Sequence, residues 1–123
     1  MSSAPDSPPY SWASARSEAR IEFARSARPT IGVEWELALV DAQTRDLSNE
    51  ASAVLSELGE NPRVHKELLR NTVELVTGIC DNTGEAIEDL RQTLTTARPI
   101  VQGRGMELFG AGTHPFAQWS AQK

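Results

Sequence analysis

The segment from Thr30 to Val40 constrains the fold more than any other part of the sequence, because large apolar residues alternate there with small or acidic ones. The odd positions hold Ile31, Val33, Trp35, Leu37 and Leu39. Successive side chains of a β-strand point to opposite faces, so this period of two predicts a strand with one buried apolar face. The opposite face carries Gly32, Glu34, Glu36, Ala38 and Val40, and is therefore partly polar.

Two further strands are predicted downstream. Thr72 to Cys80 is rich in β-branched residues, and Val73, Leu75 and Ile79 share one face. Met106 to Ala111 is a third strand, followed by a glycine-flanked loop from Gly110 to Phe116.

Two amphipathic helices separate these strands. The first is expected between the capping residues Ser48 and Asn49 and the stop at Gly59. Its apolar stripe is Ala51, Val54, Leu55 and Leu58. The second begins at Asn82, because Glu85 three residues later completes a pattern typical of a capping box. Its stripe is Ile87, Leu90, Leu94, Ala97 and Val101, Pro99 should bend or disturb its last turns, and Gly103 and Gly105 end it.

The order of strand, helix, strand, helix and strand predicts a mixed fold. It is compatible with parallel βαβ units, and equally with an antiparallel α+β sheet that has one solvent-exposed face. The period of the sequence leaves both open.

Composition excludes several classes of protein. The chain has 123 residues, with 12 basic and 17 acidic side chains and a formal net charge of −5. A net-negative chain is a poor candidate for a general nucleic-acid binder. No apolar run approaches the roughly 20 residues of a membrane-spanning helix, and a single cysteine, Cys80, forms no intrachain disulfide.

The first 28 residues differ in composition from the rest. Pro5, Pro8 and Pro9 oppose regular hydrogen bonding, and few large apolar residues are available for burial. We expect residues 1–28 to form a disordered or weakly ordered tail and residues 29–123 to form the folded part. The tail has no signal-peptide core, and its acids oppose a transit peptide.

The acidic residues are the most informative candidates for chemistry. Glu34 and Glu36 project from the same strand face, about 7 Å apart at ~3.4 Å per residue, and like charges so placed repel. A divalent cation such as Mg²⁺ would compensate them. Glu74 adds a third carboxylate in a neighbouring predicted strand. The alternative is that these acids simply line a solvated face.

Weaker candidates lie elsewhere in the chain. His114 follows Thr113 in the glycine-flanked loop, where close approach to a ligand is feasible; the alternative is a turn histidine bonded to local backbone. His65, Cys80 and His114 have no recognised zinc spacing. The sequence has no Walker A motif.

Three motifs together resemble a known family. They are Thr30-Ile-Gly-Val-Glu-Trp-Glu-Leu37, Asn71-Thr-Val-Glu-Leu-Val-Thr-Gly-Ile-Cys80 and Gly110-Ala-Gly-Thr-His-Pro-Phe-Ala-Gln-Trp119. In this order and spacing they are similar to the carboxylate–amine ligases related to glutamate–cysteine ligase, type 2. The resemblance covers roughly Arg28 to Lys123.

The resemblance implies a fold and a reaction. The fold is α+β and glutamine synthetase-like, with a curved, mostly antiparallel sheet and helices on its outer face. The reaction uses ATP and Mg²⁺ to join glutamate and cysteine into γ-glutamylcysteine through an acyl phosphate, as in the biosynthesis of glutathione-type thiols. By resemblance Glu34, Glu36, Glu74 and Glu67 match metal-binding acids, and Thr113 and His114 lie near substrate or phosphate. Arg70 stands where some relatives carry an acid.

Two alternatives accompany this interpretation. The chain is an incomplete, non-catalytic fragment of such a ligase, or the ligase joins a different acid and amine. We expect small-molecule substrates, no nucleic-acid or membrane partner and a cytoplasmic location, and the sequence allows a homo-oligomer.

Overall fold

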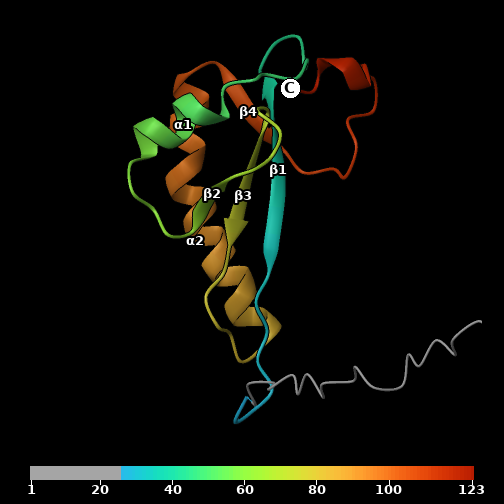
Figure 1. Ribbon diagram of the computed structural model, residues 1–123. Coiled ribbons are helices and arrows are strands. Elements are labelled where there is room, and N and C mark those ends of the chain that lie inside the picture. The colour runs from blue at the N-terminus through green and yellow to red at the C-terminus, as the bar shows by residue number, and fades with distance from the viewer. Residues whose placement is uncertain (1–25) are drawn as a thin grey trace, which may run out of the picture.

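The computed structural model describes residues 26–123, so most of the tail predicted at residues 1–28 lies outside the described part (Figure 1). The elements in chain order are β1 (Glu34–Asp41), α1 (Ala51–Leu58), β2 (Val64–Lys66), β3 (Thr72–Val76), α2 (Thr83–Gly103), β4 (Met106–Phe109) and the short 3₁₀ helix η2 (Trp119–Ala121). None of the described helices is long and apolar enough to cross a bilayer.

The four strands form one sheet in the order β2-β3-β1-β4, and every neighbouring pair is antiparallel. The antiparallel α+β sheet is therefore confirmed. β3 and β4 run in the same direction, because each pairs antiparallel with β1 between them. The long helix α2 makes the crossover that joins β3 to β4, so the βαβ pattern in the sequence is real but its two strands are not neighbours.

Both helices cover one face of the sheet (Figure 1). The buried core joins alternate residues of the strands to the inner faces of α1 and α2, as the period of two predicts. Its members are Leu37, Leu39, Ala51, Val54, Val64, Val73, Leu75, Val101 and Met106.

The predicted strand faces need correction at their outer ends. Ile31 and Trp35 are 37% and 38% exposed, although they share the apolar face of β1 with Leu37 and Leu39. β3 ends at Val76, and Ile79 is 83% exposed. Beyond Val76 an isolated bridge joins Ile31 to Cys80, and Cys80 is buried, as a small apolar residue would be.

The helices also differ in detail from the prediction. α1 begins after Glu50, which makes no side-chain cap, while Gly59 ends it with a positive φ of 73°. At the start of α2 Asn82 accepts the Glu85 N–H at 3.0 Å, as a capping residue should. α2 continues through Pro99 to Gly103.

The buried face of α2 is offset from the predicted stripe. It is formed by Ala86, Thr93, Ala97 and Val101, whereas Ile87 is 66% exposed. Leu90 and Leu94 pack at the border of the core. This face consists mostly of small side chains, and Ile87 lies outside it.

A set of contacts at the far end of β3 fixes the strands relative to each other. The Gly78 N–H donates to Asp89 Oδ2 of α2 at 2.7 Å, and Arg63 pairs with the same oxygen at 3.5 Å. Thr77 Oγ1 accepts the Val33 N–H at 2.9 Å. These bonds tie the segments that flank β1, β2 and β3 to helix α2.

Candidate metal centre and adjoining cavity

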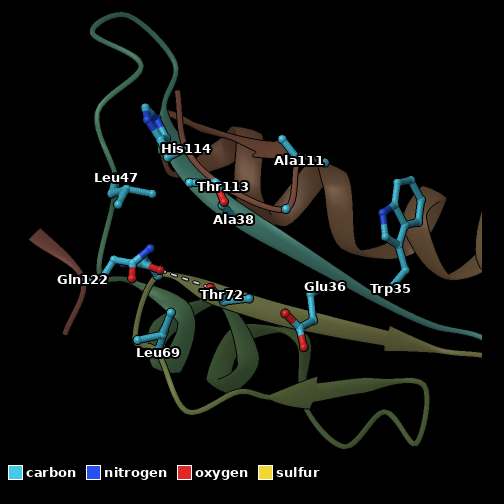
Figure 2. A pocket seen from close by; sticks show the side chains of 13 residues that line it. Trp35, Glu36, Ala38, Leu47, Leu69, Thr72, Ala111, Thr113, His114 and Gln122 are labelled. Atoms are coloured by element: carbon cyan, nitrogen blue, oxygen red, sulfur yellow. Dashed lines mark hydrogen bonds between the residues drawn. The ribbon is translucent and has the colours of Figure 1, made fainter. Parts of the chain in front are cut away.

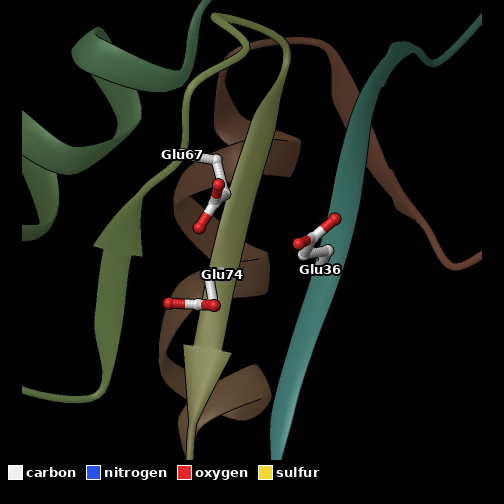
Figure 3. A group of neighbouring side chains, drawn as sticks. All are labelled: Glu36, Glu67 and Glu74. Carbon is white, nitrogen blue, oxygen red and sulfur yellow. The ribbon is translucent and has the colours of Figure 1, made fainter. Parts of the chain in front are cut away.

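Three carboxylates meet on the sheet face that the helices leave uncovered. Glu36 of β1 and Glu74 of β3 are register partners, so their side chains lie on the same face of adjacent strands. Glu67 lies just after β2 and joins them (Figure 3). One oxygen from each of Glu36, Glu67 and Glu74 lies within 4.8 Å of the others.

The acids in this group repel one another. The pKa of Glu74 is raised, first because its surroundings remove solvent from the carboxylate, and then because Glu34, Glu67 and Glu36 add negative charge. His65, the register partner of Glu74 on β2, opposes the shift. Its Nε2 donates to the Pro62 carbonyl at 3.0 Å, which fixes the ring close to the acids.

Glu34 lies beside the group rather than in it. It is on the same face of β1 one alternation away from Glu36, opposite Val76, and its charge contributes to the raised pKa of Glu74. The three acids within 4.8 Å of one another are Glu36, Glu67 and Glu74. The structure thus brings together three of the four predicted ligands, and the metal role of all four stays a prediction.

The donor set fits a hard divalent cation. Mg²⁺ binds oxygen at about 2.1 Å in octahedral geometry, so two oxygens on one ion lie roughly 3 to 4.2 Å apart. Oxygens already within 4.8 Å need only small rotamer changes to reach this spacing. Three carboxylates without any nitrogen or sulfur ligand favour Mg²⁺ or a similar cation over zinc.

A cavity of about 330 Å³ adjoins Glu36 (Figure 2). Its floor includes Glu36, Ala38 and Thr72 of the uncovered sheet face, and its far wall is the loop from Gly110 to His114. Asn71 and Thr72 are 1% and 8% exposed, and Thr72 Oγ1 donates to Asn71 Oδ1 at 3.1 Å. The metal group and the cavity therefore share one carboxylate.

The two loop residues proposed from the sequence take different positions. Thr113 lines the cavity. His114 also lines it, but its Nε2 donates to the Arg45 carbonyl at 2.8 Å and its Nδ1 accepts the Ala117 N–H at 3.0 Å. The ring packs between Phe109 and Phe116. In this conformation both ring nitrogens bind backbone, as in the turn-histidine alternative.

Asn71 and Thr72 line the cavity although the sequence pattern did not indicate them as site residues. The available signal was their place at the start of a predicted strand, since polar residues there are seldom buried without a partner. They line one cavity together with the Gly110–His114 loop and Gln122, a tertiary arrangement that the strand pattern does not reveal.

The structure is that of an antiparallel α+β protein whose uncovered sheet face carries three neighbouring carboxylates beside a cavity. The sequence model of the family "Glutamate-cysteine ligase family 2 (GCS2)" matches residues 30–123. The chain belongs to this family.

Individual relatives agree. A protein of Mycobacterium ulcerans (strain Agy99) named "Putative glutamate--cysteine ligase 2" is 72% identical over 117 residues, which cover 95% of this chain and 30% of the relative. Proteins of the same name from Mycobacterium tuberculosis (strain ATCC 25618 / H37Rv) and Mycolicibacterium paratuberculosis (strain ATCC BAA-968 / K-10) are each 76% identical over 108 residues. These residues cover 88% of this chain and 29% of each relative. The chain thus spans about 30% of the length of these curated relatives.

Proposed function

We propose that this chain supplies the metal-binding part of an ATP-dependent carboxylate–amine ligase with a glutamine synthetase-like fold. The observation that carries the proposal is the convergence of Glu36, Glu67 and Glu74 within 4.8 Å on the uncovered sheet face. Glu34 supplements their negative charge from the next position on the same face of β1.

The reaction explains why such a site is needed. In the proposed reaction the γ-carboxylate of glutamate attacks the γ-phosphorus of ATP, ADP leaves, and an acyl phosphate forms. The amine of cysteine then attacks the acyl carbon, loses a proton and expels phosphate, which gives γ-glutamylcysteine. Two negatively charged reactants must approach each other in the first step.

The acids have a defined part in that step. Glu36, Glu67 and Glu74 would hold Mg²⁺ through carboxylate oxygens, with Glu34 close by. Mg²⁺ bound there would neutralise phosphate charge and orient the transferred phosphoryl group. Thr113 also lines the cavity, and we propose that it contacts substrate or phosphate. Because the reaction consumes ATP and a reduced thiol, we place it in the cytoplasm.

The test is ADP release, measured with a coupled assay containing Mg²⁺, ATP, glutamate and a panel of amines. The assay is run on this chain and on the full-length M. tuberculosis relative, with and without the Glu34→Gln or Glu36→Gln change at the matching acid. Glu60→Gln is the matched control, because Glu60 is an exposed acid outside the site. We expect turnover with glutamate plus cysteine in the full-length relative, its loss with either site variant and its retention with the control.

Each alternative predicts a different result. Turnover only with another acid and amine would replace the substrate pair but keep the chemistry. Turnover in the full-length relative but not in this chain would mean that the chain is an incomplete part of the ligase. Near-normal turnover in both site variants would refute the metal assignment.

A further inference from the structure

The first half of β1 has an open edge on the side of β4. The Val33 carbonyl, just before β1, accepts the Thr77 N–H at 2.9 Å, so odd-numbered residues of this segment bond toward β3. Even-numbered residues bond toward β4, whose pairing with β1 covers only Ala38–Asp41. In the described part of the chain, no strand therefore pairs with the main-chain groups of Glu34 and Glu36 on this side. Such an edge is a template for a further strand.

An apolar groove lies beside this edge, on the sheet face that the helices cover. A cavity of about 220 Å³ there is lined by apolar residues of β1 and α2, among them Trp35 and Leu94. Its two charged residues, Arg98 and Glu107, pair with each other at 3.8 Å. Ile87 lies about two helical turns before Leu94 and extends the same stripe of α2. Because Trp35 and Ile87 are 38% and 66% exposed, the groove has room for further apolar side chains.

The chain just before β1 has a sequence that suits this groove. Ile21 and Phe23 alternate with Arg20 and Glu22, which is the period of a strand with one apolar face. This segment lies outside the described residues. The described chain that follows it bends at Ala27, at the end of the sheet where β1 begins (Figure 1). The segment therefore enters the fold next to the open edge.

Contacts on the other side of the bend hold it in place. Arg28 pairs with Asp81 just before α2, and Ile31 bridges Cys80. Residues 20–23 lie only four to seven positions upstream of the bend. A segment tethered so closely has a high effective concentration at the edge, which gives it an advantage over a strand from another molecule.

We propose that residues 20–24 add to the start of β1 as a fifth strand of the sheet, in a hairpin centred on Ala27. Residues equidistant from Ala27 then face each other, which places Phe23 opposite Ile31. Their side chains, with that of Ile21, lie on the apolar face toward α2. The proposal replaces the expectation of a disordered tail for these residues, and it stands independently of the ligase reaction.

The charges on the opposite face agree with this register. Arg20 lies opposite Glu34, and an opposite charge facing across two strands stabilises their pairing. Glu22 lies opposite a glycine, which has no side chain to repel it. One alternation further upstream, Glu18 would face Glu36, so like charge ends the added strand there.

Amide exchange of the ¹⁵N-labelled chain tests the pairing. In the proposed register the N–H groups of Gly32 and Glu34 donate to the added strand, so both should exchange slowly. Combining Ile21→Ser with Phe23→Ser removes the apolar face, and both amides should then exchange about tenfold faster or more. Trp12→Ser is the matched control, because it removes an apolar residue upstream of the segment and should leave both rates unchanged. Equal rates in the unaltered chain and the double variant would refute the proposal.

Two further observations keep the test decisive. A nuclear Overhauser effect between the Hα atoms of Ile21 and Val33 in the unaltered chain would establish the register without any variant, because facing residues of such a pair lie close together. Its absence would overturn the proposal even if the double variant fails to fold. A second copy of the chain at this edge would instead give protection that rises with protein concentration, and that result would also overturn the proposal.

Discussion

Gly78→Ala tests the packing that aligns the three strands of the acidic face. A Cβ added at Gly78 would lie 2.6 Å from Arg63 Nη2, 3.0 Å from Nη1 and 3.2 Å from Cζ. The guanidinium must therefore move away, and its pair with Asp89, at 3.5 Å, is lost. Gly78 does not have a positive φ, so its backbone accepts alanine.

The expected magnitude follows from two opposing terms. The Arg63–Asp89 pair is partly exposed, at 38% and 25%, so its loss together with the displaced packing should cost about 1–2 kcal/mol. Replacing glycine by alanine at a compatible φ stabilises by about 0.4–1 kcal/mol through the unfolded state. We expect a net loss of about 0.5–1 kcal/mol, or a fall in Tm of roughly 2–8 °C for a domain of this size.

The same Gly78→Ala change made in an Arg63→Ala variant gives the decisive comparison. In Arg63→Ala the guanidinium is absent, so Gly78→Ala should stabilise rather than destabilise the fold. Thermal and urea unfolding, followed by circular dichroism, measure all four members of this double-mutant cycle. An equal loss of stability in both backgrounds would refute the steric explanation.

Three further predictions concern charge and the C-terminal loop. Glu74→Gln should raise Tm in Mg²⁺-free buffer at pH 7, because the pKa of Glu74 is raised and its ionised form therefore destabilises the fold. The difference in Tm between the two proteins should vanish as the pH falls below 4.5, the ordinary pKa of a glutamate. A difference in Tm that stays constant across pH would contradict this cause. The effect of Glu88 on stability should be opposite to that of Glu74. Arg91 and Gln92 lower the pKa of Glu88 to about 2, so the stability that it contributes is present above pH 4.5 and is lost as the pH falls from 4.5 toward 2. The higher Tm of the unaltered chain relative to Glu88→Gln should therefore disappear in that pH window. His114→Phe keeps the aromatic packing but removes the bonds to Arg45 and Ala117, so the Ala117 amide should exchange with solvent faster, whereas unchanged protection would show that the ring bonds do not hold the loop.

The sequence predicted the strand that carries Glu34 and Glu36 because alternation is a local property of the chain. It predicted less well which residues of the apolar face are covered. Trp35 is 38% exposed. β4 pairs with β1 only from Ala38 to Asp41 and so does not flank Trp35, and no local period encodes how far a neighbouring strand extends. The same limit explains Ile87, which keeps helical spacing yet points away from the sheet.

Part of the candidate site was predictable from the strand pattern, and part was not. Glu36 and Glu74 follow from strand period together with antiparallel register, which makes them direct partners. Glu67 lies outside any regular strand, so only the resemblance of the motifs indicated it. The cavity was not predictable, because part of its lining is the loop from Gly110 to His114, which lies 38 to 42 residues along the chain from Thr72 and meets it only through tertiary contacts.

Calorimetric titration of Mg²⁺ into the chain tests the central claim most directly. We predict one saturable site in the unaltered chain and in Glu60→Gln. Binding should be lost in Glu36→Gln, Glu67→Gln and Glu74→Gln, because these three acids form the acidic group. Far-ultraviolet circular dichroism of each variant verifies that the fold is retained. Saturable binding of equal affinity in all of these variants, or none in the unaltered chain, would contradict the account.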